Sequence, residues 1–245
     1  MRLITFGCSF TQGIGLDGGG FMDHQYYRSP QDAILYIKPA SEHAWPFLLA
    51  EKLNLECINL GRGGSSPKFV FQMIKEFQFQ PSDTVIIQWP NSHRKVVWAN
   101  ENNIDGGGPW QTGNYTPHNP KIYTEISPHY QGMDDYYRKY NTDFDNLWEL
   151  GLLIEGAHNY LKDICKVVYS VSEENELRNN ELLPRFFPIL KEVKPFFKDQ
   201  PEDLNIPKSE ILLNKDQLII CNDEHPGRQY HIDFAEDMFK ELKSH

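Results

Sequence analysis

Residues 2–11 have the sequence RLITFGCSFT, in which a short apolar run from Arg2 to Phe6 ends at Gly7 and is followed by Ser9. A run of this length that ends at a glycine is typical of a buried strand. Polar groups with a chemical role usually lie beyond the carboxyl ends of such strands. The segment therefore predicts a first buried strand with a hydroxyl group at its carboxyl end.

The same pattern recurs along the chain, where short apolar runs alternate with segments of helical periodicity. Further strands are predicted at residues 55–60, 84–89, 165–170 and 217–221, and helices at residues 41–53, 67–77, 134–164 and 229–243. Ser41 is the expected cap of the first of these helices, and Pro67 suits the first turn of the second. Strands of four to six residues that alternate with helices favour βαβ units, and hence a parallel sheet covered on both faces.

Two long segments interrupt the alternation, at residues 96–133 and 173–214. The first is polar and rich in glycine, proline, asparagine and aromatic residues, and the second carries five prolines. Loops this long inside a domain are usually functional or disordered. We therefore predict a single domain over residues 1–245, with both segments as insertions over the active edge of the sheet that determine substrate specificity.

Composition excludes several classes of protein. The chain has 245 residues, 40% of them hydrophobic, and a net charge of −10, so we expect neither nucleic acid nor an anionic membrane as a partner. No secretory signal pattern and no apolar run of about 18 residues occurs, which favours a cytoplasmic protein.

The cysteines form no C-x-x-C pair and are expected to be reduced and mostly buried; they are Cys8, Cys57, Cys165 and Cys221.

Four polar segments follow predicted strands. Ser9 follows the first strand, residues 59–66 (NLGRGGSS) the second, Asn91 the third and residues 222–227 (NDEHPG) the fifth. Each segment taken alone also suits an ordinary turn. In a parallel sheet, however, all four lie at one edge and combine a nucleophile, backbone and side-chain donors for an oxyanion, and a histidine with a carboxylate. This combination predicts acyl transfer.

These segments resemble the motifs of the SGNH hydrolase (GDSL-like esterase/lipase) superfamily. Residues 7–11 (GCSFT) are similar to its first block, Gly-Asp-Ser-x-Thr, with Cys8 in the place of the aspartate. Residues 59–66, 88–91 and 222–226 are similar to the second, third and fifth blocks. The resemblance implies a flavodoxin-like α/β fold: a three-layer α/β/α sandwich with a central, mainly parallel five-stranded sheet. The long insertions would then follow strands three and four.

The resemblance also assigns roles to individual residues. It implies Ser9 as the nucleophile and His225 as its base. The oxyanion hole would consist of the backbone N–H groups of Ser9 and Gly64 and the side-chain amide of Asn91. No cofactor and no metal are implied.

The partner of His225 departs from the family pattern, which places an aspartate three residues before the histidine. Asn222 occupies that position, and Asp223 lies two residues before His225. An amide can orient an imidazole but cannot stabilise the imidazolium, and this exchange costs about 10⁴ in rate in a serine protease. We therefore expect Asp223 to orient His225, with Asn222 as the alternative.

The sequence thus predicts a serine ester hydrolase that acts on a small-molecule or carbohydrate ester, with removal of a carbohydrate O-acetyl group as the first expectation. Aromatic residues in the first insertion could stack on sugar rings or pack the insertion onto the sheet. Two alternatives stay open. One is a catalytically impaired binding protein that keeps the fold. The other is a metal-dependent hydrolase that uses Asp223, His225 and His231, with Asp233 nearby; otherwise His231 is expected to pack beside the site.

Overall fold

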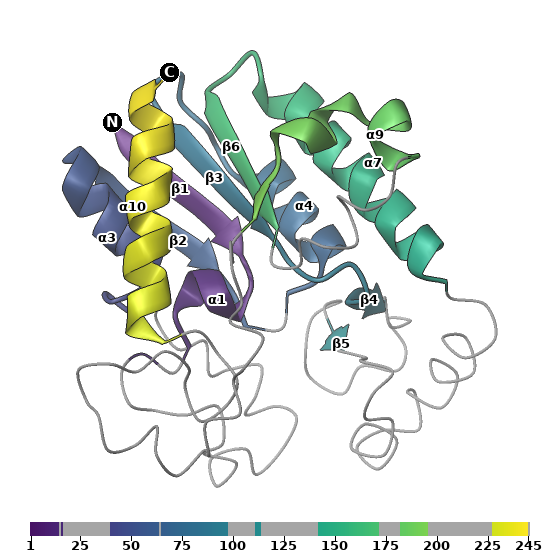
Figure 1. Cartoon of the computed structure of the whole chain (residues 1–245), viewed down its shortest axis with the longest axis horizontal. Coiled ribbons are helices and arrows are strands. Elements are labelled where there is room, and N and C mark those ends of the chain that lie inside the picture. Colours follow the sequence, from purple (N-terminus) through teal and green to yellow (C-terminus); the bar gives the residue numbers. More distant parts are fainter. Residues whose placement is uncertain are drawn as a thin grey trace, which may run out of the picture.

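A computed structural model of the chain describes residues 1–14, 16, 40–63, 65–97, 111–113, 142–171, 182–195 and 227–244. The described residues form a five-stranded sheet with the order β2-β1-β3-β6-β7 (Figure 1). Its strands are β1 (Arg2–Gly7), β2 (Glu56–Gly61), β3 (Thr84–Trp89), β6 (Lys166–Val171) and β7 (Lys194–Pro195). Every neighbouring pair is parallel. The predicted parallel α/β sheet is therefore confirmed.

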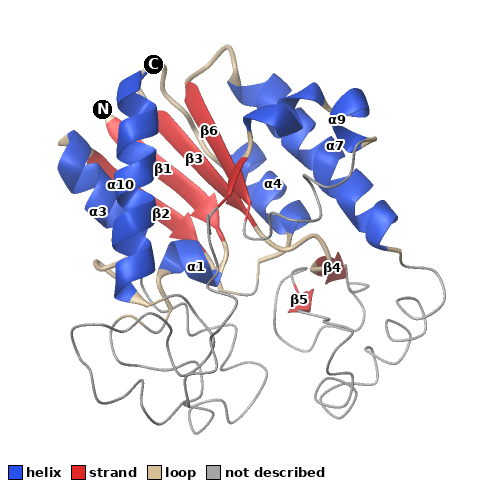
Figure 2. Ribbon diagram, viewed as in Figure 1, coloured by secondary structure: helices blue, strands red, loops and turns tan. Residues whose placement is uncertain are grey.

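Helices cover both faces of this sheet (Figure 2). One face carries α3 (Trp45–Leu53) and α10 (Arg228–Ser244). The other carries α4 (Pro67–Glu76) and α7 (Asp143–Leu161), followed along the chain by α9 (Leu183–Phe186) and η3 (Pro188–Glu192). The short helix α1 (Ser9–Gln12) lies at the carboxyl ends of β1 and β2. A small antiparallel pair, β4 (Lys95–Val97) and β5 (Gln111–Gly113), completes the described elements.

The two faces of the sheet have separate apolar cores, because successive residues of a strand point to opposite faces. In β1, Ile4 and Phe6 pack with the α4 and α7 side, whereas Leu3 packs with the α3 and α10 side. All three are fully buried. The strands are therefore buried on both sides, which is why their sequences are almost continuously apolar.

Helix bounds differ from the sequence prediction in two places. The helix predicted from Ser41 begins at Trp45, and Ser41 Oγ instead accepts a hydrogen bond from the His43 N–H at 3.1 Å within the preceding turn. Helix α7 ends at Leu161, three residues earlier than predicted, and begins after Thr142, whose side chain accepts from the Asp145 N–H. The predicted residues 134–141 lie outside the described part of the chain.

The fifth strand of the described sheet comes from within residues 173–214. Strand β7 pairs with β6 through Ser170–Lys194 and Val171–Pro195. The chain just before β7 is buried in the α7-side core, with Leu183, Phe187 and Leu190 among its members. Residues 182–195 therefore belong to the layers of the domain. The strand predicted at residues 217–221 lies outside the described residues.

At the amino ends of the strands, a bidentate ion pair joins β1 to the turn before β3. Arg2 Nε and Nη2 donate to the two carboxylate oxygens of Asp83 at 2.9 and 2.7 Å. The Asp83 side chain is fully buried, and its pKa is lowered, chiefly by these hydrogen bonds from Arg2. No helix in the described part of the chain is long and apolar enough to cross a membrane.

Candidate active site

Two of the predicted site residues lie at the same edge of the sheet. Ser9 is the first residue of α1, two positions after the end of β1, and Asn91 lies two positions after the end of β3. Strands β1 and β3 are parallel neighbours, paired from Leu3–Thr84 to Phe6–Ile87. Ser9 is 3% exposed. The candidate nucleophile and the candidate oxyanion donor therefore follow adjacent strands in the same direction.

Glycines at the ends of β1 and β2 allow α1 to lie directly against the sheet. A Cβ at Gly7 would overlap Thr11 Oγ1 and lie 3.0 Å from the Gln88 carbonyl oxygen. A Cβ at Gly61 would lie 2.6 Å from the Gln12 nitrogen and 2.7 Å from Thr11 Cβ. The glycine two residues before Ser9 and the threonine two residues after it are thus parts of one close contact. This contact explains the Gly-x-Ser-x-Thr spacing in physical terms.

Hydrogen bonds from three directions hold α1 in place. Thr11 Oγ1 donates to Gln88 Oε1 at 2.5 Å, and the Thr11 carbonyl oxygen accepts from Asn59 Nδ2 at 2.8 Å. Gln12 Oε1 accepts from the Gly63 N–H at 2.6 Å. A helix of four residues has no stability of its own, so these bonds to β3, β2 and the following loop determine its position. Ser9 is therefore preorganised by the surrounding fold.

The loop after β2 is itself well ordered by side-chain bonds. Asn59 Oδ1 accepts from the Gly61 N–H at 2.9 Å, and Ser65 Oγ donates to the Arg62 carbonyl oxygen at 2.7 Å. Ser66 caps α4 by accepting from the Phe69 N–H, and Pro67 occupies the first turn as predicted. Gly64, the predicted backbone donor of the oxyanion hole, lies outside the described residues, and its role stays a prediction.

Asn91 begins a tight turn that fixes the orientation of its side chain. Its Oδ1 accepts from the His93 N–H at 2.7 Å, and its carbonyl oxygen accepts from the Arg94 N–H at 3.1 Å. The His93 ring is in turn 3.0 Å from Asn146 Nδ2 on α7. The first bond identifies the carbonyl end of the Asn91 amide. The other end of this amide is a hydrogen-bond donor, as an oxyanion hole requires.

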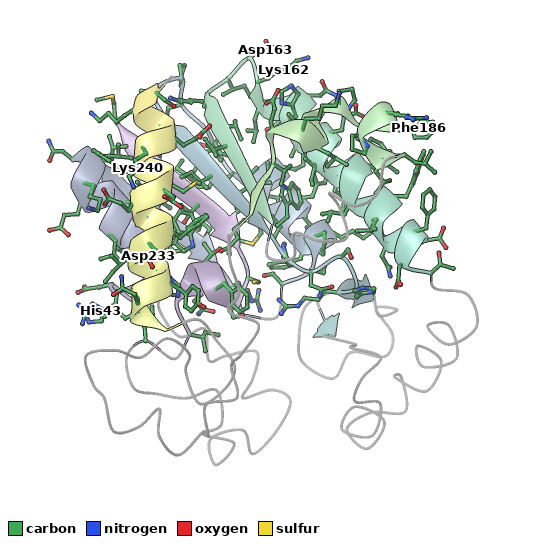
Figure 3. The ribbon with its side chains drawn as sticks, viewed as in Figure 1. His43, Lys162, Asp163, Phe186, Asp233 and Lys240 are labelled. Carbon is green, nitrogen blue, oxygen red and sulfur yellow. The ribbon has the colours of Figure 1, made fainter. Side chains whose placement is uncertain are left out.

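His231 lies in the first turns of α10 and not in the segments that directly follow β1 and β3. It is fully buried, and its Nδ1 accepts from the Trp45 N–H at 3.1 Å. Asp233 lies on the exposed face of the same helix, where it accepts from Gln229 Nε2 at 2.9 Å (Figure 3). Helix α10 therefore directs these two side chains to different surroundings and does not assemble them into one ligand set. Asn222, Asp223 and His225 lie outside the described residues.

The described cysteines form no disulfide with one another. Cys8, Cys57 and Cys165 are free cysteines, and Cys8 and Cys165 are buried. Burial raises the pKa of Cys57 to about 12 and that of Cys165 to about 11. Both groups therefore stay protonated and weakly nucleophilic near neutral pH. Cys221 lies outside the described part of the chain.

The structure adds residues at the candidate site to which the sequence analysis gave no role. Asn59, Gln12 and Gln88 all bind α1 or the loop beside it through their side chains. One signal was present in the sequence for Gln88, which is a polar residue near the end of the otherwise apolar run Val85 to Trp89. A fully buried glutamine in such a strand requires a hydrogen-bond partner. The identity of that partner was not visible in the sequence.

Comparison with known proteins gives similar solved structures at low sequence identity. No family model matches the chain, and no curated protein matches it. The acetyl xylan esterase Est2A from the rumen bacterium Butyrivibrio proteoclasticus is 12% identical, with a TM-score of 0.51 over 99% of this chain and 63% of that chain. A carbohydrate esterase with divergent catalytic and non-catalytic binding functions in its active site is 10% identical, with a TM-score of 0.51 over 100% of this chain and 65% of that chain.

A lipolytic protein of the G-D-S-L family from Veillonella parvula is also similar, at 12% identity and a TM-score of 0.45, with 98% of each chain covered. The structures that resemble this chain over nearly its full length include lipolytic proteins of the G-D-S-L family and carbohydrate esterases. The chain has the α/β fold of the SGNH hydrolases, with a parallel sheet of at least four strands flanked by helices. The fold implied by the sequence resemblance is confirmed.

Proposed function

We propose that the protein is a serine ester hydrolase in which Ser9 forms the acyl-enzyme. The observation that carries the proposal is the placement of Ser9 on a helix tethered at the carboxyl edge of the sheet, next to the strand that Asn91 follows. A serine on a backbone that its surroundings hold in one position suits nucleophilic catalysis. The fold shared with a carbohydrate esterase and an acetyl xylan esterase supports the same assignment.

In the proposed first step, Ser9 Oγ bonds to the ester carbonyl carbon while His225 accepts the hydroxyl proton. The backbone N–H groups of Ser9 and Gly64 and the Asn91 amide stabilise the resulting oxyanion. The bond to the alcohol then breaks, and the alcohol takes the proton from the imidazolium. Water next attacks the acyl group, with its proton passing to His225, and this step releases the acid and restores the Ser9 hydroxyl. The mechanism requires no metal and no cofactor.

Asp223 is the proposed partner of His225. A carboxylate stabilises the imidazolium that forms in both steps, whereas the amide of Asn222 would only orient the ring. The variants Asp223→Asn and Asn222→Ala distinguish the two. Loss of activity confined to Asp223→Asn supports the assignment, and loss confined to Asn222→Ala would transfer the role to Asn222.

The proposed substrate is a carbohydrate ester, with an acetyl group as the acyl part. Support comes from the aromatic residues of residues 96–133, which suit stacking on sugar rings, and from the fold shared with a carbohydrate esterase and an acetyl xylan esterase. Acetylated oligosaccharides and p-nitrophenyl esters of increasing chain length provide a direct comparison. A clear preference for acetyl over longer acyl groups is the expected result.

Labelling with a fluorophosphonate probe tests the proposed function. The expected result is a single modified residue, Ser9, and no labelling of Ser9→Ala. Ser244→Ala is the matched control, because Ser244 is an exposed serine at the far end of α10. A folded wild-type protein that is neither labelled nor active on acetyl esters would instead favour the second candidate, a binding protein that keeps the fold. The observation that favours a binding protein is Asn222, which stands where the family pattern has an aspartate.

A further inference from the structure

A fully buried glutamine lies at the centre of a hydrogen-bonded chain beneath the candidate nucleophile. Gln88 Oε1 accepts from Thr11 Oγ1 at 2.5 Å and from Trp45 Nε1 at 3.2 Å. The indole N–H can only donate, so the carbonyl end of the Gln88 amide must face Trp45. Gln88, Thr11 and Trp45 are each 0% exposed. The three side chains thus connect α1, β3 and α3 without access to water.

The series of hydrogen bonds continues from α3 to α10. Helix α3 has Ala44 at its N-cap position and no side-chain cap there. The Trp45 N–H, one of the donors that a helix start leaves unpaired, is bound by His231 Nδ1 at 3.1 Å. Because Nδ1 is an acceptor in this bond, the proton of the neutral ring is on Nε2. His231 therefore replaces the local cap that Ser41 was expected to supply.

We propose that Thr11, Gln88, Trp45 and His231 form a positioning network for the active site; this inference rests on the proposed function. Thr11 lies two residues after Ser9 within α1. Its hydrogen bond to Gln88 therefore determines the position of Ser9 relative to the end of β1. His231 fixes the first turns of α10, which begins three residues after His225 in the chain. One network therefore connects α1, which carries the candidate nucleophile, with the first turns of α10.

The energetics of the network favour positioning over simple support of the core. Apolar side chains at positions 11, 45 and 88 together would fill the same space with no polar group to desolvate. Moreover, Gln88 Nε2 is buried and has no hydrogen-bond partner among the described residues. A buried donor without a partner lowers stability. The glutamine is thus a poor choice for stability alone, and its two accepted bonds give it a geometric role.

The pair Thr11→Val and Thr11→Ser tests the proposal. Valine keeps the shape and removes the donor to Gln88, whereas serine keeps the donor. We expect Thr11→Val to lower kcat and the rate of fluorophosphonate labelling at Ser9 by about 10- to 100-fold with little change in KM. Thr11→Ser should remain within about threefold of the wild type. Rescue by serine is a result that a purely steric role of Thr11 would not give.

Two further variants separate positioning from stability. Trp45→Phe removes the indole donor but keeps an aromatic ring against Phe234, whose ring centroid is 4.9 Å from that of Trp45. Like Thr11→Val, this variant should lower the rate of labelling at Ser9. It serves as the test of the network if Thr11→Val does not fold. Ile154→Val is the control, because Ile154 belongs to the core on the opposite face. It should lower the melting temperature and leave labelling unchanged.

Equal labelling rates for folded Thr11→Val and Thr11→Ser would overturn the network proposal while leaving the hydrolase assignment intact. Equal rates for folded Trp45→Phe and the wild type would overturn it as well where Thr11→Val does not fold. A wild-type protein that is not labelled at Ser9 would overturn the hydrolase assignment and the network together. The two kinds of failure are therefore distinguishable.

Discussion

Replacement of Gly61 by alanine tests how closely α1 must approach the sheet. The new Cβ would lie 2.6 Å from the Gln12 nitrogen and 2.7 Å from Thr11 Cβ, whereas ordinary contacts begin at 3.4 Å. The backbone of α1 must then retreat by about 0.8 Å. Gly61 has no positive φ, so the perturbation is steric and involves no backbone strain at the residue itself.

The expected consequences differ in size for stability and for reactivity. Overpacking costs about 1–3 kcal/mol, and the lower entropy of the unfolded alanine chain offsets about 0.4–1 kcal/mol of this. The variant should therefore fold with a modest loss of stability. A displacement near 1 Å of a catalytic group can lower a rate by about 100-fold. We expect a loss of this order in the rate of Ser9 labelling.

The assay compares fluorophosphonate labelling rates and denaturant unfolding for Gly61→Ala and a matched variant, Gly156→Ala. A Cβ at Gly156, within α7, would lie 3.2 Å from the Phe71 ring, which is a much milder contact. This control should keep the wild-type labelling rate. If Gly61→Ala is folded and reacts as fast as Gly156→Ala, the reasoning that α1 requires this close approach is refuted.

Three further predictions concern single groups. Asn91→Ala should lower kcat by about 10²–10³ with little change in KM, because it removes a donor to the oxyanion; an unchanged kcat in steady-state assays would exclude Asn91 from the oxyanion hole. The lowered pKa of Asp83 beside Arg2 stabilises the fold at pH values above the ordinary pKa of about 3.9, and this stabilisation is lost as the pH falls through the lowered value. The difference in unfolding free energy between the wild type and Asp83→Asn should therefore be largest near neutral pH and shrink in acid, and a difference that does not vary with pH would contradict this. Cys57 and Cys165, whose pKa values are raised to about 12 and about 11, should resist iodoacetamide at pH 8 until denaturant is added, as followed by mass spectrometry; rapid alkylation of the native protein would be inconsistent with their burial.

The parts of the fold that local pattern determines could be predicted from the sequence. Strand β3 has the predicted bounds, because a run of β-branched and aromatic residues ends at a proline. Strand β7 could not be found in this way, since it has two residues and one of them is Pro195. The start of α3 was also misplaced. Its cap is a histidine 186 residues further along the chain, and no local rule includes such a partner.

In the candidate site, too, some features follow from local sequence patterns and others depend on residues far apart in the sequence. The positions of Ser9 and Asn91 at one edge follow from strand ends and parallel order, both of which sequence patterns indicate. The tethers of α1 do not follow, because nothing in the sequence pairs Thr11 with Gln88 across 77 residues. Such pairings depend on how adjacent strands place their side chains in space. A single sequence therefore predicts the positions of candidate site residues more readily than the contacts that hold them in place.

The tethers of α1 have a consequence for the order of folding. Their partners are separated along the chain by 48, 51 and 77 residues, so the entropy of closing those loops must be overcome before α1 has anything to bind. We expect Ser9, the candidate nucleophile, to reach its final geometry only after β1, β2 and β3 have assembled. During synthesis, Ser9 is made before residue 88, and we expect it to become reactive only after residue 88 has left the ribosome and joined the sheet. Reactivity at Ser9 would therefore report the completion of folding in this half of the molecule.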